Sequence, residues 1–303
     1  MDNNRKMWLN GEIMAVKDAK INVLSPTSQF GANVFEGIRC YWNQDEKQLY
    51  AFRLDDHFDR LANSIKLLKL ECDYTIEDMK KGFFDIIKAN DYKEDIAVRQ
   101  TVFLDGFGSW SSTGPTGMFI APIARKRSYD KKSLKCCISS WERISDRSLS
   151  PRIKVGANYL NSRLAHMEAL ENGYDTAIIM NNAGKVAEAP GSCLFLIRDN
   201  ELITPSITSS ILESITRDTV IKLAKEELNM IVTERDVDRT ELYIADEIFL
   251  CGSAMEIMSV SNVDNYEIGN EEVGQITKEL QRLYFEVIRG DNLNYSKWIT
   301  PVY

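Results

Sequence analysis

Hydrophobic and polar positions follow the pattern of a β-hairpin first and that of a helix soon afterwards. Two short apolar runs at residues 7–9 and 12–14 are joined by Asn10-Gly11, and Asn-Gly between apolar runs is typical of a tight hairpin. Further on, apolar residues recur at spacings of three and four, namely Phe58, Leu61, Ile65 and Leu68. This spacing predicts an amphipathic helix over residues 56–70.

The rest of the first 120 residues continues this mixture. The pattern predicts a second helix over residues 76–90 and a strand over 96–104, which together indicate an α+β arrangement. A stretch rich in Gly, Ser, Thr and Pro follows at residues 106–117, and the chain becomes basic soon after. We take this shift as a domain boundary. It predicts a small N-terminal domain over 1–122, an interdomain loop over 123–130 and a large domain over 131–303.

The second half carries more β signal than a regular α/β alternation would. Predicted strands cover residues 176–180, 192–197, 201–204 and 247–251, and predicted helices lie near 160–172, 215–228 and 272–288. Turn residues at 182–184 and 199–200 predict hairpins. The sequence has no internal repeat, G-x-G-x-x-G fingerprint or Walker loop, which disfavours a nicotinamide or ATP enzyme of the usual type.

Composition narrows the class of function. The chain has 303 residues with 37 Lys+Arg against 45 Asp+Glu, so its formal charge is 37 − 45 = −8. This balance disfavours a broad surface for nucleic acid or anionic membranes and favours small metabolites. No apolar stretch approaches 18 residues, the six cysteines form no C-x-x-C pair, and only two histidines occur. We therefore expect a cytoplasmic protein with reduced thiols, no metal site and no Ser-His or Cys-His nucleophile.

Lys154 is the first candidate for chemistry. It lies between the β-branched residues Ile153 and Val155, and Gly156 and Ala157 follow it. A lysine in apolar surroundings has a lowered pKa, so its amine is nucleophilic and suited to a Schiff base. The small residues would let a flat cofactor approach the backbone. The competing interpretation is a surface lysine on an edge strand.

Two further positions suit a charged cofactor. Glu188 ends a short apolar run before a turn, where its carboxylate could face the ring nitrogen of pyridoxal phosphate (PLP). Ser214 is a good N-cap for a following helix, and the first amides of that helix, at Ile215 and Thr216, would suit a phosphate. A solvated glutamate and a plain helix cap are the competing interpretations.

Five motifs in one order give the chain a family resemblance. They are Phe35-Glu36-Gly37-Ile38-Arg39, Lys154-x-Gly-x-Asn158-Tyr159, Glu188, Ile215-Thr216-Arg217-Asp218 and Gly252-Ser253-Ala254-x-Glu256. The chain resembles branched-chain aminotransferases, which are fold-type IV, class IV PLP enzymes, from Trp8 to about Tyr284. The resemblance implies an α+β fold of two domains, a smaller α/β sandwich-like one and a larger one whose barrel-like sheet carries Lys154 and Glu188.

The same resemblance implies a role for each cofactor residue. Lys154 resembles the lysine that binds the cofactor as a Schiff base and shuttles the substrate proton. Glu188 resembles the partner of the pyridinium nitrogen, and Tyr159 resembles the residue that bonds the phenolate oxygen. Arg60 resembles an arginine that reaches the phosphate, and it lies off the buried stripe of its helix. The other implied phosphate ligands are the amides of Ile215 and Thr216 and the hydroxyl of Ser253.

Substrate contacts and assembly follow from the resemblance in the same way. Phe35, Gly37 and Arg39 resemble the side-chain pocket, and Arg99 resembles a pocket arginine for an acidic side chain or carboxylate. The amides of Ser253 and Ala254 resemble the site for the α-carboxylate. The resemblance also implies at least a homodimer, in which a loop from the partner helps to close the pocket. Residues 103–119, which include Trp110, are more aromatic than a free surface loop normally is.

The predicted activity is a ping-pong transfer of an amino group between a branched-chain or apolar L-amino acid and 2-oxoglutarate. Some positions depart from the family pattern, namely Phe30, 189–193 and Ser214, so substrate choice could differ. The alternatives are a specialised class IV aminotransferase of secondary metabolism, a D-amino-acid transaminase, an aminodeoxychorismate lyase-like enzyme and a non-catalytic binding protein that kept the fold.

Overall fold

The structure is a computed structural model that describes residues 5–125, 131–270 and 272–303. The chain divides into two compact units. Among the described residues, unit 1 comprises 5–125, 153–157 and 286–303, and unit 2 comprises 131–152 and 158–285 apart from 271. Each unit has its own sheet and its own hydrophobic core.

Unit 1 is built on a seven-stranded antiparallel sheet with the strand order β16-β4-β3-β5-β6-β1-β2. The strands are β1 (Lys6–Leu9), β2 (Glu12–Ala15), β3 (Asn33–Asn43), β4 (Gln48–Phe52), β5 (Ile96–Leu104), β6 (Thr116–Ala124) and β16 (Ile299–Pro301). The predicted N-terminal hairpin is confirmed, because β1 pairs with β2 across Asn10 and Gly11. Both turn residues have positive φ, 48° and 99°, which Asn and Gly tolerate best.

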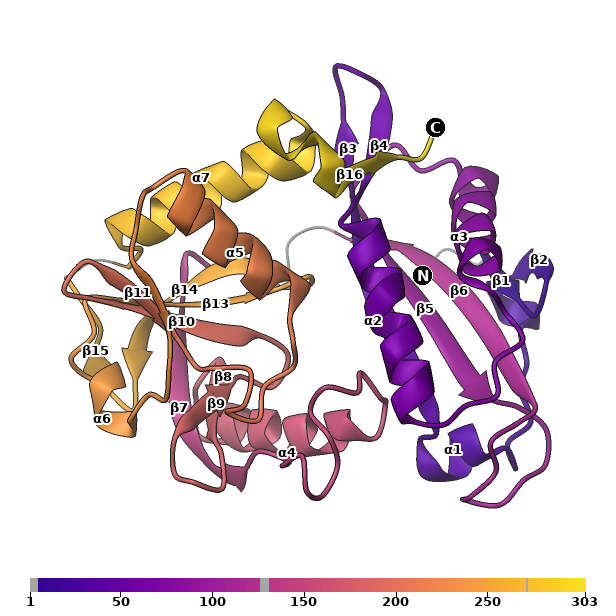
Figure 1. The fold of residues 1–303 in the computed structure, drawn as a ribbon, viewed down its shortest axis with the longest axis horizontal. Helices are drawn as coiled ribbons and strands as arrows, with labels where there is room; N and C mark the ends of the chain where they lie inside the picture. Colours follow the sequence, from indigo (N-terminus) through magenta and orange to yellow (C-terminus); the bar gives the residue numbers. More distant parts are fainter. Residues whose placement is uncertain (1–4, 126–130, 271) are drawn as a thin grey trace. The chain divides into compact units, whose positions relative to one another are not determined.

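Two helices pack against this sheet (Figure 1), namely α2 (Leu54–Leu67) and α3 (Ile76–Asn90). The stripe predicted from the sequence is the buried one, since Phe58 and Leu61 are in the core with Phe83 of α3. A capping box at Thr75 and Asp78 starts α3, so its first residue is set locally. The short elements of the unit are η1 (Val16–Asp18), α1 (Pro26–Phe30) and η2 (Leu293–Trp298).

Two segments distant in sequence complete unit 1. Strand β16 pairs with β4, and Val155 forms an isolated bridge with Val34 of β3. The sequence pattern predicts one domain over 131–303, whereas the structure groups 153–157 and 286–303 with the N-terminal residues. Long-range pairing decides this, and no local pattern carries it. The predicted loop 123–130 differs at its start, where β6 runs to Ala124, and its residues 126–130 lie outside the described residues.

Unit 2 contains a mixed nine-stranded sheet with the order β12-β11-β10-β13-β14-β7-β8-β9, and β15 pairs with β14. Its strands are β7 (Ser133–Glu142), β8 (Thr176–Met180), β9 (Val186–Glu188), β10 (Cys193–Arg198), β11 (Glu201–Thr204), β12 (Val232–Glu234), β13 (Glu247–Gly252), β14 (Glu256–Val263) and β15 (Tyr266–Glu267). Its helices are α4 (Asn158–Glu171), α5 (Ile215–Glu226), α6 (Arg239–Leu242) and α7 (Gln275–Arg289), whose last residues are grouped with unit 1. The predicted hairpins at 182–184 and 199–200 are confirmed as β8–β9 and β10–β11.

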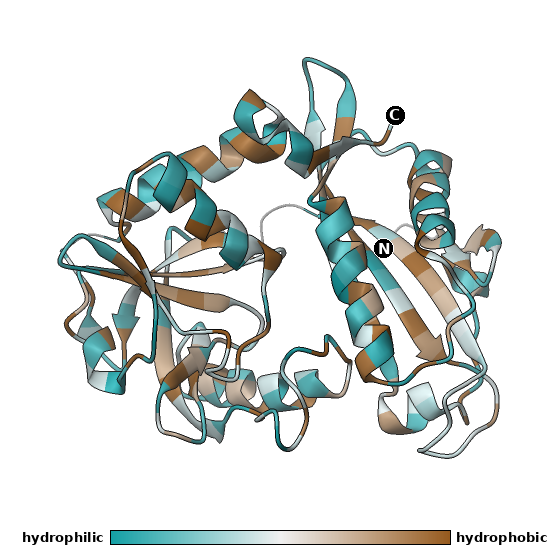
Figure 2. Ribbon diagram, in the orientation of Figure 1, coloured by the Kyte–Doolittle hydropathy of each residue, from teal (hydrophilic) through white to brown (hydrophobic). Residues whose placement is uncertain are grey.

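Apolar residues concentrate on the strands, and polar residues face outward on the helices (Figure 2). Central strands of unit 2 such as β10 and β13 are buried along almost their whole length. Such strands read as continuous apolar runs because both of their faces are covered. This explains why the sequence signals them clearly.

Candidate active site

The backbone around Lys154 is fixed to the sheet and to α2 within unit 1. The Lys154 amide donates to the Ser64 hydroxyl at 3.2 Å, and its carbonyl accepts from the Phe35 amide at 3.0 Å. Two residues on, Gly156 donates to the Asn33 carbonyl at 3.0 Å, and a Cβ there would come within 2.8 Å of the Asn33 side chain. Only glycine allows this close approach. Lys154 therefore extends from a segment that is held on both sides.

Three of the predicted site residues meet over one aromatic ring. The Lys154 ammonium lies 5.1 Å from the centroid of Phe35, and the Arg99 guanidinium carbon lies 3.4 Å from it. Gly37 is directly opposite Arg99 in the β3–β5 register, and a Cβ at Gly37 would meet nothing within 4 Å. An apolar wall, two cations and open space thus occur together on one face of β3.

Arg39 and Phe30 lie in other surroundings. Arg39 is buried, with its guanidinium carbon 5.1 Å from the centroid of the Tyr41 ring. Phe30 is the last residue of α1 and is half exposed. In the described structure, the predicted pocket of unit 1 is therefore formed mainly by Phe35, Gly37 and Arg99.

Arg60 belongs to a buried ion-pair network on the α2 side of β3. Its Nε and Nη2 donate to the two carboxylate oxygens of Glu36 at 2.8 and 2.7 Å, and His57 Nδ1 lies 2.7 Å from the same carboxylate. Burial alone would raise the pKa of Glu36, but Arg60 and then His57 outweigh it and hold that pKa well below its usual range. Burial lowers the pKa of His57 despite the opposing effect of Glu36. The network is therefore an ionised carboxylate, a guanidinium and a neutral imidazole.

Glu188 is held at the end of β9 in unit 2. Arg143 donates to it from Nε at 3.0 Å and from Nη2 at 2.7 Å, and the Leu212 amide donates at 3.2 Å. The Cys193 thiol lies 3.7 Å from the same carboxylate. These contacts fix a carboxylate that is only 4% exposed, so the solvated glutamate considered from the sequence does not describe it.

The start of α5 offers donors for an anion. Ser214 caps the helix by accepting from the Arg217 amide, and Arg217 is anchored to Glu234 at 2.7 Å and to Thr204. The first amides of an α-helix have no acceptor within the helix, and the helix dipole adds positive potential there. The amides of Ile215 and Thr216, with the buried Thr216 side chain, can thus bind a phosphate.

The remaining predicted residues of unit 2 lie in turns and at the start of α4. Ser253 and Ala254 are in the turn between β13 and β14, where Ser253 is half buried and Ala254 is exposed. Tyr159 is the second residue of α4 and is 37% exposed. Near Glu188, the Ser192 hydroxyl is buried and has no hydrogen-bond partner in the described part of the chain. A polar group of a ligand would satisfy it.

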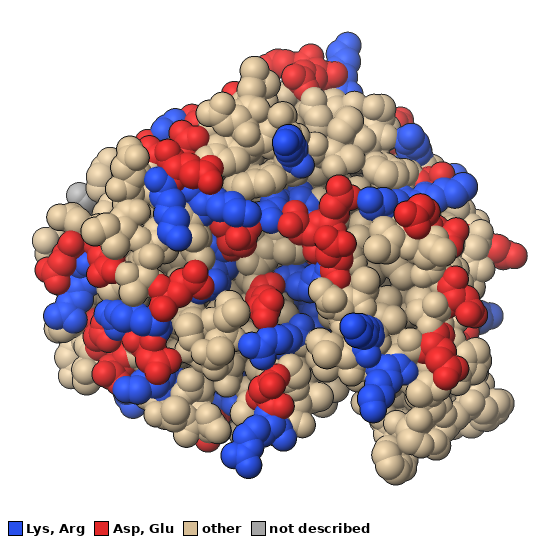
Figure 3. Space-filling view, in the orientation of Figure 1, with Lys and Arg blue, Asp and Glu red and all other residues tan. Residues whose placement is uncertain are grey.

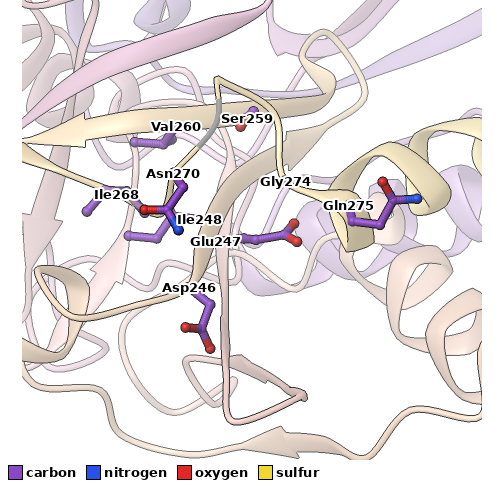
Figure 4. A pocket seen from close by; sticks show the side chains of 9 residues that line it. All are labelled: Asp246, Glu247, Ile248, Ser259, Val260, Ile268, Asn270, Gly274 and Gln275. Atoms are coloured by element: carbon purple, nitrogen blue, oxygen red, sulfur yellow. The ribbon is translucent and has the colours of Figure 1, made fainter.

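A small pocket on unit 2 contains none of these residues. Its lining includes Asp246, Glu247, Asn270 and Gln275 (Figure 4). The carboxylate of Glu247 accepts from the amides of Ile276 and Thr277, so it caps α7. This pocket is accordingly a feature of how α7 begins.

Sequence reasoning missed several residues that the structure places beside the predicted ones. Glu36 was part of a motif without a role, and His57, Ser64 and Arg143 had none. The spacing of His57, Arg60 and Ser64 along α2 was a signal that they share one helix face. Nothing local pointed from Arg143 to Glu188, which are 45 positions apart.

Comparison with known proteins defines the class. Residues 33–263 match the family model of class IV amino-transferases. A probable branched-chain-amino-acid aminotransferase of Aquifex aeolicus is 39% identical over 300 residues, covering 98% of this chain and 96% of the relative. The crystal structure of the branched-chain amino acid aminotransferase from Thermobaculum terrenum in its PLP form has a TM-score of 0.95 and 44% identity, covering 100% of both chains. The T.th. enzyme complexed with N-(5'-phosphopyridoxyl)-L-glutamate has a TM-score of 0.93 and 33% identity, covering 98% of both chains.

The chain belongs to the class IV aminotransferase family. The predicted fold class and the predicted enzyme class, a PLP-dependent transaminase, are thereby confirmed. The chemistry of the described side chains fits PLP: cationic and helix-terminal donors suit its phosphate, and the buried carboxylate of Glu188 suits its pyridine nitrogen.

Proposed function

We propose that this transaminase moves an amino group between a branched-chain or other apolar L-amino acid and 2-oxoglutarate by a ping-pong mechanism. The observation that carries the proposal is the stacking of Arg99 on Phe35 beside Lys154. An apolar ring favours aliphatic side chains, and a guanidinium favours the distal carboxylate of glutamate. One pocket can then serve both halves of the cycle.

Relatives support this choice of substrates. The T.th. enzyme has been crystallised with a phosphopyridoxyl conjugate of L-glutamate and with 4-methylvaleric acid, an aliphatic acid with a branched end. The Thermoproteus uzoniensis enzyme, 37% identical, has been crystallised with norvaline. We infer the same two substrate classes for this chain.

We assign roles to the residues of this chain as follows. When bound, PLP supplies the aldehyde carbon that takes up the amino group and a ring that withdraws electrons. Lys154 Nζ binds the cofactor covalently, and its amine then carries the proton to and from the substrate Cα. Glu188 holds a proton on the pyridine nitrogen, and Tyr159 donates to the phenolate oxygen. The proposed phosphate ligands are Arg60, Ile215, Thr216 and Ser253.

The substrate is oriented by a second set of groups. In our proposal Phe35, Gly37 and Arg39 form the side-chain pocket with Arg99, and the amides of Ser253 and Ala254 bind the α-carboxylate. Ser253 and Ala254 lie in a turn after Gly252, where a Cβ would come within 3.2 Å of the Gly191 carbonyl. Glycine at that position lets the two backbones approach.

Replacing Arg99 by alanine is expected to separate the two substrate classes. The half-reaction with glutamate or 2-oxoglutarate should lose about 2 kcal/mol or more of transition-state stabilisation, because a charged hydrogen bond to the distal carboxylate is removed. The half-reaction with leucine should change less. Single-turnover absorbance changes with each substrate measure both, with Arg147→Ala, an exposed arginine, as the control. An equal loss with both substrates would make Arg99 structural.

We also propose that the enzyme is at least a homodimer. Exposed apolar residues gather at one end of unit 1, in the β5–β6 connection and near α1: Phe107 and Trp110 are 74% and 78% exposed, and Val23 is 76% exposed. Figure 3 shows a largely uncharged surface at that end. An exposed patch of this kind is typical of an interaction site. A second copy of the chain is the partner that the family resemblance implies.

Sedimentation velocity at micromolar protein is expected to show no active monomer. Trp110→Ser should shift the distribution toward the monomer, because an aromatic anchor in an interface is a frequent energetic hot spot. Trp141→Ser, which removes an exposed tryptophan from β7, is the matched control. A fully active monomer in the wild type would contradict the proposal.

We place the enzyme in the cytoplasm. All six cysteines are free thiols in the structure, as a reducing compartment would keep them. Among the residues that the structure describes, no helix has the length and apolarity needed to cross a bilayer.

A further inference from the structure

One face of α2 carries three polar side chains that all contact the Lys154 side of unit 1. His57 and Arg60 contact Glu36 of β3, and Ser64 accepts from the Lys154 amide. Positions three and four residues apart share a helix face, so these three side chains form one stripe beside the apolar one. A single helix thus fixes both the lysine backbone and the guanidinium of Arg60.

The network around Glu36 is almost dry. The side chains of Glu36 and His57 are 1% and 2% exposed, and that of Arg60 is 13% exposed. Because Glu36 is ionised, its oxygens can only accept hydrogen bonds. The Nδ1 atom of His57 must therefore carry the proton that it shares with Glu36. Both carboxylate oxygens are then occupied by Arg60, and one of them also by His57.

The geometry of the network points to orientation more than to stability. A buried ion pair adds little net stability, since desolvation offsets the attraction between the charges. A two-pronged contact between a carboxylate and a guanidinium does fix the plane of the guanidinium. His57 in turn fixes the carboxylate. The arrangement therefore sets where the Arg60 charge is presented.

We propose that Glu36 and His57 are positioning residues that hold the Arg60 guanidinium for the phosphate of PLP. The inference rests on the role proposed above for Arg60. Glu36 and His57 act only through Arg60, so their effect is confined to the phosphate. Loss of either should weaken the recognition of the phosphate and leave the recognition of the pyridine ring unchanged.

The test compares two ligands that differ only in the phosphate. The full-length protein, freed of cofactor, is titrated with PLP and with pyridoxal, and the ratio of the two dissociation constants is measured by absorbance or fluorescence. Glu36→Gln should raise the dissociation constant of PLP about tenfold or more, because glutamine presents one acceptor where Arg60 requires two. The constant for pyridoxal should stay within about twofold of the wild type.

Variants of His57 keep the test sharp if Glu36→Gln fails to fold. His57→Leu removes the donor and should raise the dissociation constant of PLP severalfold, while His57→Asn keeps a donor near Nδ1 and should restore wild-type binding. Asp59→Asn, which removes an exposed carboxylate from the same helix, is the matched control. Arg60→Ala reports the whole effect of the phosphate contact.

Two results would overturn the inference. Equal weakening of PLP and pyridoxal binding in the Glu36 and His57 variants would show a structural role alone. An unchanged ratio in these variants, with a lowered preference for PLP in Arg60→Ala, would show that Arg60 needs no support. If Arg60→Ala itself keeps the wild-type ratio, the phosphate role of Arg60 fails, and this inference fails with it.

Discussion

Replacing Lys154 by alanine is expected to abolish turnover, with a loss of at least about 10⁴-fold in each half-reaction. Both the covalent attachment of the cofactor and the proton transfer at the substrate Cα depend on the same Nζ atom in our proposal. Folding should survive, because the hydrogen bonds that fix this segment are made by the backbone of Lys154 and by Gly156.

Two measurements test the lysine. Stopped-flow absorbance with leucine follows the half-reaction, and borohydride treatment followed by mass spectrometry shows whether PLP is covalently bound to the protein. Lys135→Ala, an exposed lysine on β7, is the control and should behave as the wild type. Normal turnover in Lys154→Ala, or a reducible link to the cofactor in that variant, would assign the role to another residue.

Glu188→Gln is expected to slow the half-reactions by on the order of 10² or more. A neutral amide cannot hold a proton on the pyridine nitrogen as a carboxylate does, so the ring would withdraw electrons less strongly. The same change leaves the buried guanidinium of Arg143 without its carboxylate, and loss of one partner of a buried pair typically costs about 3–5 kcal/mol of stability. A lower melting temperature should accompany the slower chemistry.

The two effects are separated by measuring rates on folded protein at saturating PLP. Circular dichroism identifies the temperature range in which the variant is folded, and single-turnover rates are compared within it. Glu171→Gln, an exposed glutamate at the end of α4, controls for the substitution itself. Unchanged half-reaction rates in folded Glu188→Gln would remove Glu188 from the mechanism.

Much of the fold was predictable because local patterns carry it. The helix over 76–90 and the strands over 96–104, 176–180 and 201–204 have the bounds that the sequence predicted. Each shows either a helical spacing of apolar residues or a buried apolar run between turn signals. Helix α2 was displaced by a few residues at each end, which is the usual uncertainty of helix ends.

The site was predictable at the level of motifs and not of contacts. The motifs named Lys154, Glu188 and Arg60, and the family match supports the chemistry that they imply. They did not indicate that Glu36 and His57 surround Arg60, or that Arg143 pairs with Glu188. Ion pairs between residues 21 to 45 positions apart depend on how strands and helices pack, which has no local signature.

The sequence by itself determined most of the helices and strands, the acidic charge balance and the set of reactive residues. Only the tertiary structure decided that residues 153–157 and 286–303 join the N-terminal sheet, and that Lys154, Phe35 and Arg99 meet over one ring. The physical reason is the range of the forces involved. Helix caps, turns and hydrophobic periodicity act over a few neighbouring residues, whereas strand pairing and buried ion pairs depend on segments that only folding brings together.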